Sequence, residues 1–129
     1  MKAMRTFSLA IALVALAPFS SSAQDVIVTV SSPAEAKLAA LDEGTPALDR
    51  RKFPPYAQLL DVLDRVCKEN RTQIGTLVTR SVTALWKQDI NISHLRFLQS
   101  MKASVAEGAP AASVSCADLA ARVAAGSRQ

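Results

Sequence analysis

A spacing of three and four residues runs along residues 55–88, where mostly apolar side chains share one face. The series consists of Tyr56, Leu60, Leu63, Cys67, Asn70, Ile74, Leu77 and Ser81. This spacing is typical of an α-helix that packs one seam against its partners, and flanking leucines and valines widen the seam to the stripe of a helical bundle. The pattern therefore predicts one long central helix over about 55–88. A kink or break between Asn70 and Gly75 stays open as an alternative, because Gly75 lowers helix propensity.

Three shorter helices are predicted from their end signals. The run Ser32-Pro33-Ala34-Glu35 combines a serine cap, a proline suited to the first helical position and a glutamate that completes a capping box, and Gly44 ends this helix. Ser93 is the expected cap of a helix over residues 94–107, and Ser115 is the expected cap of the last one. The fold class is therefore all-α. We expect a small bundle of three to four helices around the central one, in a single domain over residues 32–129.

The segment before the first helix is β-branched and short. Residues Gln24–Val30 resemble a strand, but we found no confident strand partner for them in the sequence. We therefore expect residues 24–31 to form an extended N-terminal tail. The alternative is a strand lent to the edge of a partner's sheet.

Residues 1–23 have the three-part pattern of a secretory signal peptide. Lys2 and Arg5 supply the positive start, Phe7–Ala17 is the apolar run, and small residues precede a cleavage point after Ala23. The apolar run is shorter than the roughly 20 residues of a spanning helix, so no stable membrane anchor is expected after cleavage. The sequence thus predicts a periplasmic or secreted protein.

The charge of the chain becomes modest once the signal peptide is removed. Without Lys2 and Arg5 the formal net charge falls from +4 to +2, so nucleic-acid binding is not expected. Arg50, Arg51 and Lys52 form a basic cluster, which we interpret either as a contact for an anionic partner or, with more weight, as a solvated loop.

The two cysteines of an exported chain predict one disulfide, Cys67–Cys116. The two positions are 49 residues apart, and closing a loop of that length stabilises a fold by about 4 kcal/mol in the chain-entropy treatment. If the helix from His94 folds back along the central helix, Cys116 arrives beside Cys67, which agrees with this pairing. A pair of free thiols is the minor alternative, and the absence of C-x-x-C argues against a thioredoxin-like role.

The sequence shows no recognisable catalytic, cofactor or metal signature. His94 is the single histidine, and we interpret it as a surface residue at a helix start; acid–base chemistry with Asp89 is the weaker alternative. One histidine and two oxidised cysteines cannot supply a four-ligand zinc site. No phosphate-binding glycine loop, G-x-S-x-G or H-E-x-x-H is present, so we expect neither an enzyme nor a cofactor.

Two aromatic residues mark the ends of the predicted central helix. Tyr56 and Trp86 can each bury a ring and keep a polar atom in water, and both are candidate partner contacts, with packing at the core edge as the favoured alternative. Asn70 interrupts the apolar seam. We interpret it as a residue that fixes helix register or, with less weight, as part of a small polar pocket.

Two short runs resemble the cysteine regions of the small acid-stress chaperones of the bacterial periplasm. They are Cys67-Lys68-Glu69-Asn70 and Ser115-Cys116-Ala117-Asp118-Leu119. Their order along the chain is reversed and the flanking motifs of that family are absent. The resemblance therefore implies no more than that a periplasmic holdase belongs among the candidate functions.

Together these patterns favour an exported, non-enzymatic helical interaction protein, either a stress-protective chaperone or a protein inhibitor. Its partner would be a protein or client whose identity the sequence does not give, and its oligomeric state is left open. The alternative is a small-ligand carrier that uses the interior of the bundle.

Overall fold

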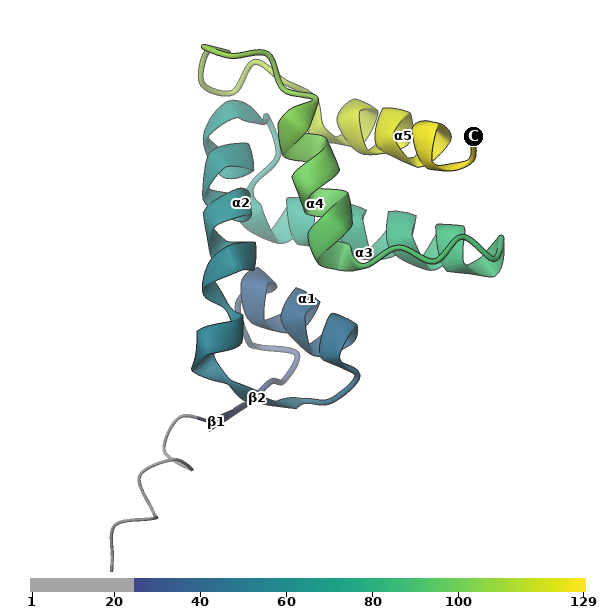
Figure 1. Ribbon diagram of the computed structural model, residues 1–129. Coiled ribbons are helices and arrows are strands. Elements are labelled where there is room, and N and C mark those ends of the chain that lie inside the picture. Colours follow the sequence, from purple (N-terminus) through teal and green to yellow (C-terminus); the bar gives the residue numbers. More distant parts are fainter. Residues whose placement is uncertain (1–24) are drawn as a thin grey trace, which may run out of the picture.

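The computed structural model describes residues 25–129, which form five α-helices and one small two-stranded sheet (Figure 1). The elements are β1 (Asp25–Ile27), α1 (Ala34–Glu43), β2 (Ala47–Asp49), the 3-10 helix η2 (Arg50–Lys52), α2 (Pro54–Val66), α3 (Arg71–Lys87), α4 (His94–Ala103) and α5 (Cys116–Ser127). A mostly helical fold is thus confirmed. The predicted signal peptide and its cleavage point after Ala23 lie outside the described residues. Within the described range, no helix is both long and apolar enough to cross a membrane.

The helices pack in two directions. α2 and α4 lie beside each other, whereas α3 and α5 lie beside each other and run at a steep angle to that pair (Figure 1). α3 and α5 both run away from the disulfide in the same direction, and α1 packs against α2, α3 and α4. The expected hairpin of α4 along one continuous helix is therefore replaced by a crossed arrangement.

The predicted continuous helix over 55–88 is wrong, because the chain leaves the helical path at residues 67–70. Cys67 is extended and forms an isolated parallel bridge with Val114, and the Lys68 N–H donates to the Val114 carbonyl at 2.8 Å. α3 then starts at a capping box. The Asn70 side chain accepts from the Gln73 N–H and the Gln73 side chain accepts from the Asn70 N–H, both at 2.9 Å. Asn70 therefore begins a helix and does not set a register within one.

Apolar side chains from all five helices fill the core. Those with 0% or 1% of their surface exposed are Leu38, Ala39, Leu60, Leu63, Ile74, Val78, Val82, Leu85, Phe97, Leu98, Met101, Cys116 and Leu119. Burial of each leucine, isoleucine, valine, phenylalanine or methionine side chain among them contributes about 1.5–3 kcal/mol, before the loss of conformational entropy. The interior is therefore occupied by packed side chains.

The segment expected to be an N-terminal tail is paired in the structure. β1 runs antiparallel to β2 with Val26 opposite Leu48, and the Val28 N–H donates to the Pro46 carbonyl at 2.8 Å. β2 lies in a stretch that reads as a linker in the sequence, and three residues are too few for a strand pattern. Leu48 is buried, which ties the small sheet to the core.

The helix ends follow the sequence signals in part. Gly44 ends α1 in the left-handed conformation, and the hydroxyls of Ser93 and Ser115 cap α4 and α5 as predicted. The capping box predicted for α1 is absent, because Ser32 Oγ accepts from the Thr29 N–H at 2.9 Å and leaves α1 without a side-chain cap. α4 ends at Ala103, four residues before the predicted limit.

Candidate functional site

A groove of about 570 Å³ lies between the start of α1, the loop that precedes it and one face of α3. Residues from α1 and its loop form one wall, and residues from successive turns of α3 form the other. The side chains that matter for its chemistry are Val30, Lys37, Leu38, Thr72, Thr76 and Arg80. The groove is therefore built by helices that are separated in sequence by the whole of α2.

Gly75 sets how closely the two walls approach. A Cβ atom added at this buried glycine would lie 3.1 Å from the Cβ of Ala34, so the bare backbone of α3 lets α1 come near. Ala34 is half-buried and Leu38 is fully buried, and both line the groove together with Gly75. These three residues give the groove an apolar floor.

The charged side chains that line the groove are both cations. Lys37 donates from Nζ to the Val30 carbonyl at 3.2 Å, which fixes the lysine against the loop without neutralising it. Arg80 forms no ion pair with any residue between 25 and 129. Arg71, the first residue of α3, differs from Arg80 because its guanidinium pairs with Glu35 at 3.2 Å and with Asp61. The positive charge of the groove is therefore uncompensated.

A second hollow of about 310 Å³ lies along the same helix and shares three lining residues with the groove, Thr72, Thr76 and Arg80. Leu77 and Glu69 also line this second hollow. The Arg80 side chain therefore borders both the groove and the second hollow.

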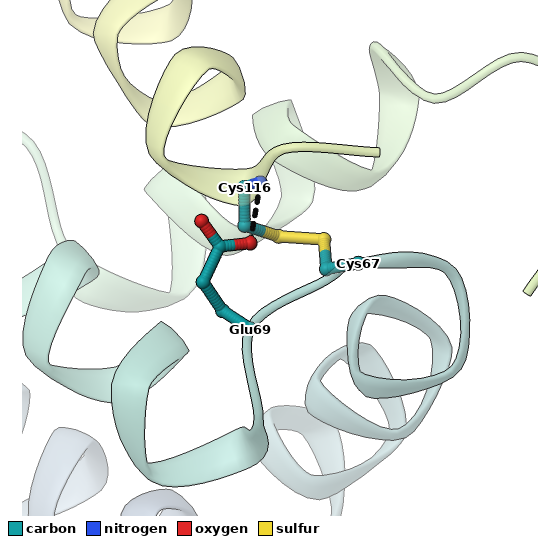
Figure 2. A group of neighbouring side chains, drawn as sticks. All are labelled: Cys67, Glu69 and Cys116. Atoms are coloured by element: carbon teal, nitrogen blue, oxygen red, sulfur yellow. Dashed lines mark hydrogen bonds between the residues drawn. A yellow bond between two sulfur atoms is a disulfide. The ribbon is translucent and has the colours of Figure 1, made fainter. Parts of the chain in front are cut away.

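The predicted disulfide is present. Cys67 and Cys116 are bonded, their Cα atoms are 5.5 Å apart, and both residues are buried (Figure 2). Glu69 lies beside them and caps α5, since its carboxylate accepts from the Cys116 N–H at 2.8 Å and the Ala117 N–H at 3.0 Å. Burial opposes ionisation of Glu69, but these backbone hydrogen bonds outweigh it and lower the pKa of the carboxyl.

The same three side chains have the residue types of a metal site, because the two sulfurs and a Glu69 oxygen lie within 4.8 Å of one another. Both sulfurs are consumed in the disulfide, and zinc binds cysteine as a thiolate. The Glu69 carboxylate is already engaged by α5. The disulfide and the Glu69 hydrogen bonds therefore hold the end of α2 and the residues before α3 against the start of α5.

The basic cluster forms η2 and is partly neutralised by neighbouring acids. Arg51 pairs with Asp49 at 2.6 Å and Lys52 lies 3.6 Å from Glu43, while Arg50 is exposed. Hydrogen bonds from Arg51 lower the pKa of Asp49 to about 2. None of the three basic residues lines the groove.

The interpretation of His94 as a surface residue is wrong, and so is its pairing with Asp89. His94 is 1% exposed, and its Nδ1 lies 2.8 Å from Asp42 Oδ1. Tyr56 is also buried and donates its hydroxyl to Asp42 Oδ2 at 2.7 Å. In this structure the Tyr56 ring belongs to the core edge, which was the favoured alternative for it.

Trp86 packs against this buried histidine. The two ring centroids are 5.4 Å apart and the rings are nearly perpendicular, while the indole N–H donates to the Ile92 carbonyl at 2.7 Å. Trp86 is 41% exposed, so part of the ring still faces solvent as a candidate contact. His94 Nε2 is buried and has no hydrogen-bond partner among the described residues, and His94 does not line the groove.

Burial alone would raise the pKa of Asp42. Hydrogen bonds from the His94 ring, the His94 N–H, the Tyr56 hydroxyl and the Leu95 N–H outweigh burial and lower the pKa to about 2. Burial and the bond to Asp42 together raise the pKa of Tyr56. Asp42 is therefore ionised near neutral pH. Its hydrogen bonds link α1, which carries Asp42, to Tyr56 of α2 and to the start of α4.

The sequence interpretation missed the groove because its two cations are 43 positions apart on separate helices. A glycine inside a helical pattern can signal a close backbone approach, and Gly75 was the available clue. We compared the chain with models of known protein families, with characterised proteins and with solved structures, and none matched.

Proposed function

We propose that the chain is an exported, non-enzymatic interaction protein that binds a segment of another protein in the groove between α1 and α3. The observation that carries this proposal is the groove itself, which combines about 570 Å³ of space, an apolar floor and two uncompensated cations. Export is supported by the signal-peptide pattern of residues 1–23 and by the disulfide, which persists in oxidising compartments.

A protein segment suits the groove because its rim is open. Val30, Ser31, Pro33, Thr76 and Arg80 line the groove and are themselves exposed to solvent. A small molecule in its binding site usually has roughly 70–90% of its surface buried, which requires walls on most sides. A peptide needs only part of its surface covered, because the chain continues beyond the site on both ends.

Of the two types of interaction protein expected from the sequence, the inhibitor type is the better supported. Among the described residues, the large apolar side chains with substantial exposure are Ile27, Val30, Leu41 and Trp86. Ile27 lies in β1, Val30 in the loop before α1, Leu41 in α1 and Trp86 in α3, so these side chains belong to four separate segments. A chaperone that holds unfolded clients needs a broad apolar surface. A chaperone would have to expose part of the packed core before it could hold a client.

Site-specific photo-crosslinking tests the proposal. A benzophenone amino acid placed at Thr76, on the groove wall, should capture one identifiable protein when the chain is expressed in an exporting cell. Gln99 is the matched control, because it is exposed on α4 and does not line the groove. The captured protein must then bind the purified wild-type chain. Identical products at Thr76 and Gln99, or no product at Thr72, Thr76 or Arg80, would argue against binding in the groove.

A small-ligand carrier is the second candidate, because about 570 Å³ lies within the usual range of roughly 300–1,000 Å³ for ligand sites. Since core side chains fill the interior, a carrier would use the surface groove and not the bundle interior. Native mass spectrometry of the gently purified protein checks this candidate. A co-purified small molecule that is lost in an Arg80→Glu variant would favour the carrier, and a mass equal to the bare chain would favour the protein partner.

A further inference from the structure

We infer that the groove binds an acidic peptide segment, with a carboxylate held between Lys37 and Arg80 and the aliphatic side chain two residues away on the apolar floor. This inference rests on the proposed function, because it specifies the chemistry of the partner for the same groove. It commits to the acidic segment as occupant on the basis of charge complementarity.

The two cations come from opposite walls. Lys37 lies on α1 and Arg80 on α3, and the residues that line the groove include no acid. The Lys37 ammonium spends one of its three hydrogens on the Val30 carbonyl, so it is held in place with two donors left. The Arg80 guanidinium can offer a carboxylate two parallel N–H donors. A carboxylate that enters the groove therefore meets donors on both sides.

Two of the three groove-lining threonines of α3 do not compete for the role of donor. The Thr76 hydroxyl donates to the Thr72 carbonyl at 3.2 Å, and the Thr79 hydroxyl donates to the Gly75 carbonyl at 3.0 Å. With these two hydrogens committed to the helix itself, the hydroxyls of Thr72, Ser31 and Ser32 are the neutral side-chain donors that line the groove, and Lys37 and Arg80 are the charged and stronger ones. Their removal should therefore have a large effect on binding.

The length of the groove limits the segment. From Thr72 to Arg80 the helix advances about 12 Å at 1.5 Å per residue. An extended peptide covers that distance with about four residues at roughly 3.3 Å each. Side chains alternate along such a peptide, so residues two positions apart face the groove together, and the acidic and the aliphatic residue must have one residue between them.

A defined peptide series tests the inference on the mature, oxidised protein. The probes are end-blocked octapeptides whose central four residues are Leu-Ala-Glu-Ala, Leu-Ala-Gln-Ala or Leu-Ala-Lys-Ala, so that the leucine and the variable residue share one face. Calorimetry should show the glutamate peptide binding at least about tenfold more tightly than the glutamine peptide. Raising salt from about 50 mM to about 300 mM should weaken this binding, because both cations are near the surface. Amide chemical-shift changes should gather at Lys37 and along Thr72–Arg80.

Charge variants locate the effect. Lys37→Gln and Arg80→Gln should each weaken binding of the glutamate peptide by about fivefold or more, with circular dichroism confirming an unchanged fold. Lys102→Gln is the matched control, since Lys102 is exposed on α4 and does not line the groove; binding should stay at the wild-type level. Equal affinity for the glutamate and glutamine peptides, or an affinity that neither Lys37→Gln nor Arg80→Gln changes, would overturn the inference. So would binding to phosphatidylglycerol vesicles in preference to the peptides.

The two proposals fail separately. If crosslinking at Thr76 captures a partner while acidic peptides do not bind, the interaction function stands and the acidic occupant is wrong. If acidic peptides bind through Lys37 and Arg80 while crosslinking in cells finds no protein, the groove chemistry stands and the proposed interaction function is wrong.

Discussion

Asp42 Oδ1 lies 2.8 Å from His94 Nδ1, and this contact joins the end of α1 to the start of α4 across 52 residues of sequence. The same carboxylate accepts hydrogen bonds from the backbone N–H groups of His94 and Leu95 and from the Tyr56 hydroxyl. Because an ionised carboxylate can only accept, Nδ1 of His94 must carry a hydrogen. Asp42 thus provides a second cap for α4, beside Ser93, from a different helix.

Asp42 should make the fold sensitive to acid. Its pKa is lowered from 3.8 to about 2 in the folded state, so its contribution is complete above the unfolded value and is lost as pH falls from about 4 to about 2. The free energy of unfolding should fall by on the order of 2 kcal/mol over that interval from this group. Urea denaturation followed by circular dichroism at a series of pH values measures the change.

The Asp42→Asn variant is the control for this acid effect. It keeps the size of the side chain and removes the titration, so its stability should be lower at neutral pH and should change less between about pH 4 and pH 2. Glu69 also has a lowered pKa, and its titration should remain in this variant. Parallel pH profiles for wild type and Asp42→Asn would show that Asp42 is not responsible.

Asn70 should contribute to stability as the cap of α3. Asn70→Ala removes the side-chain half of a capping box, and loss of such a cap costs about 1 kcal/mol. Asn91→Ala is the comparison, because Asn91 is exposed in the loop before α4 and has no side-chain hydrogen bond among the described residues. Urea unfolding should show a larger loss of stability for Asn70→Ala than for Asn91→Ala. Equal stability of both variants would contradict the capping role.

The break between α2 and α3 shows what helical spacing can and cannot predict. Cys67 and Asn70 are three positions apart, so the seam keeps its phase on both sides of the break and the pattern predicts one helix. The contrary signal was local, since Asn70 followed by Gln73 has the spacing of a capping box. The end signals Gly44, Ser93 and Ser115 were interpreted correctly because each acts on its own neighbours.

Contacts between distant residues could not be obtained in this way. Asp42 and His94 lie on different helices, and nothing in the sequence near either residue names the other as its partner. Lys37 and Arg80 are equally separate, and each alone resembles an ordinary surface cation. The groove exists only because α1 and α3 pack together at Gly75, and that packing is a property of the fold. The disulfide was predictable, since the chain has just two cysteines.

Gly75 should respond to substitution through its contact with α1. Alanine in a helix interior is favoured over glycine by about 1 kcal/mol, but the new Cβ at position 75 would lie 3.1 Å from Ala34. Gly126 in α5 has open space around it and serves as the matched position. Gly126→Ala should therefore raise the free energy of unfolding by up to about 1 kcal/mol, and Gly75→Ala should raise it less or lower it. A larger gain at position 75 than at 126 would show that the two helices do not meet closely.

The disulfide should be the strongest single contributor to stability outside the core. It closes a loop of 49 residues and joins the end of α2 to the start of α5. Chain entropy assigns such a cross-link about 4 kcal/mol, a large share of the roughly 5–15 kcal/mol of a typical domain. The double variant Cys67→Ala/Cys116→Ala and the dithiothreitol-reduced wild type should both lose about that much in urea unfolding, and they should agree with each other within about 1 kcal/mol. Glu69→Gln in the oxidised protein should lose less, because it weakens the cap of α5 and keeps the cross-link. If the reduced wild type unfolds at the same urea concentration as the oxidised protein, the cross-link does not stabilise the fold.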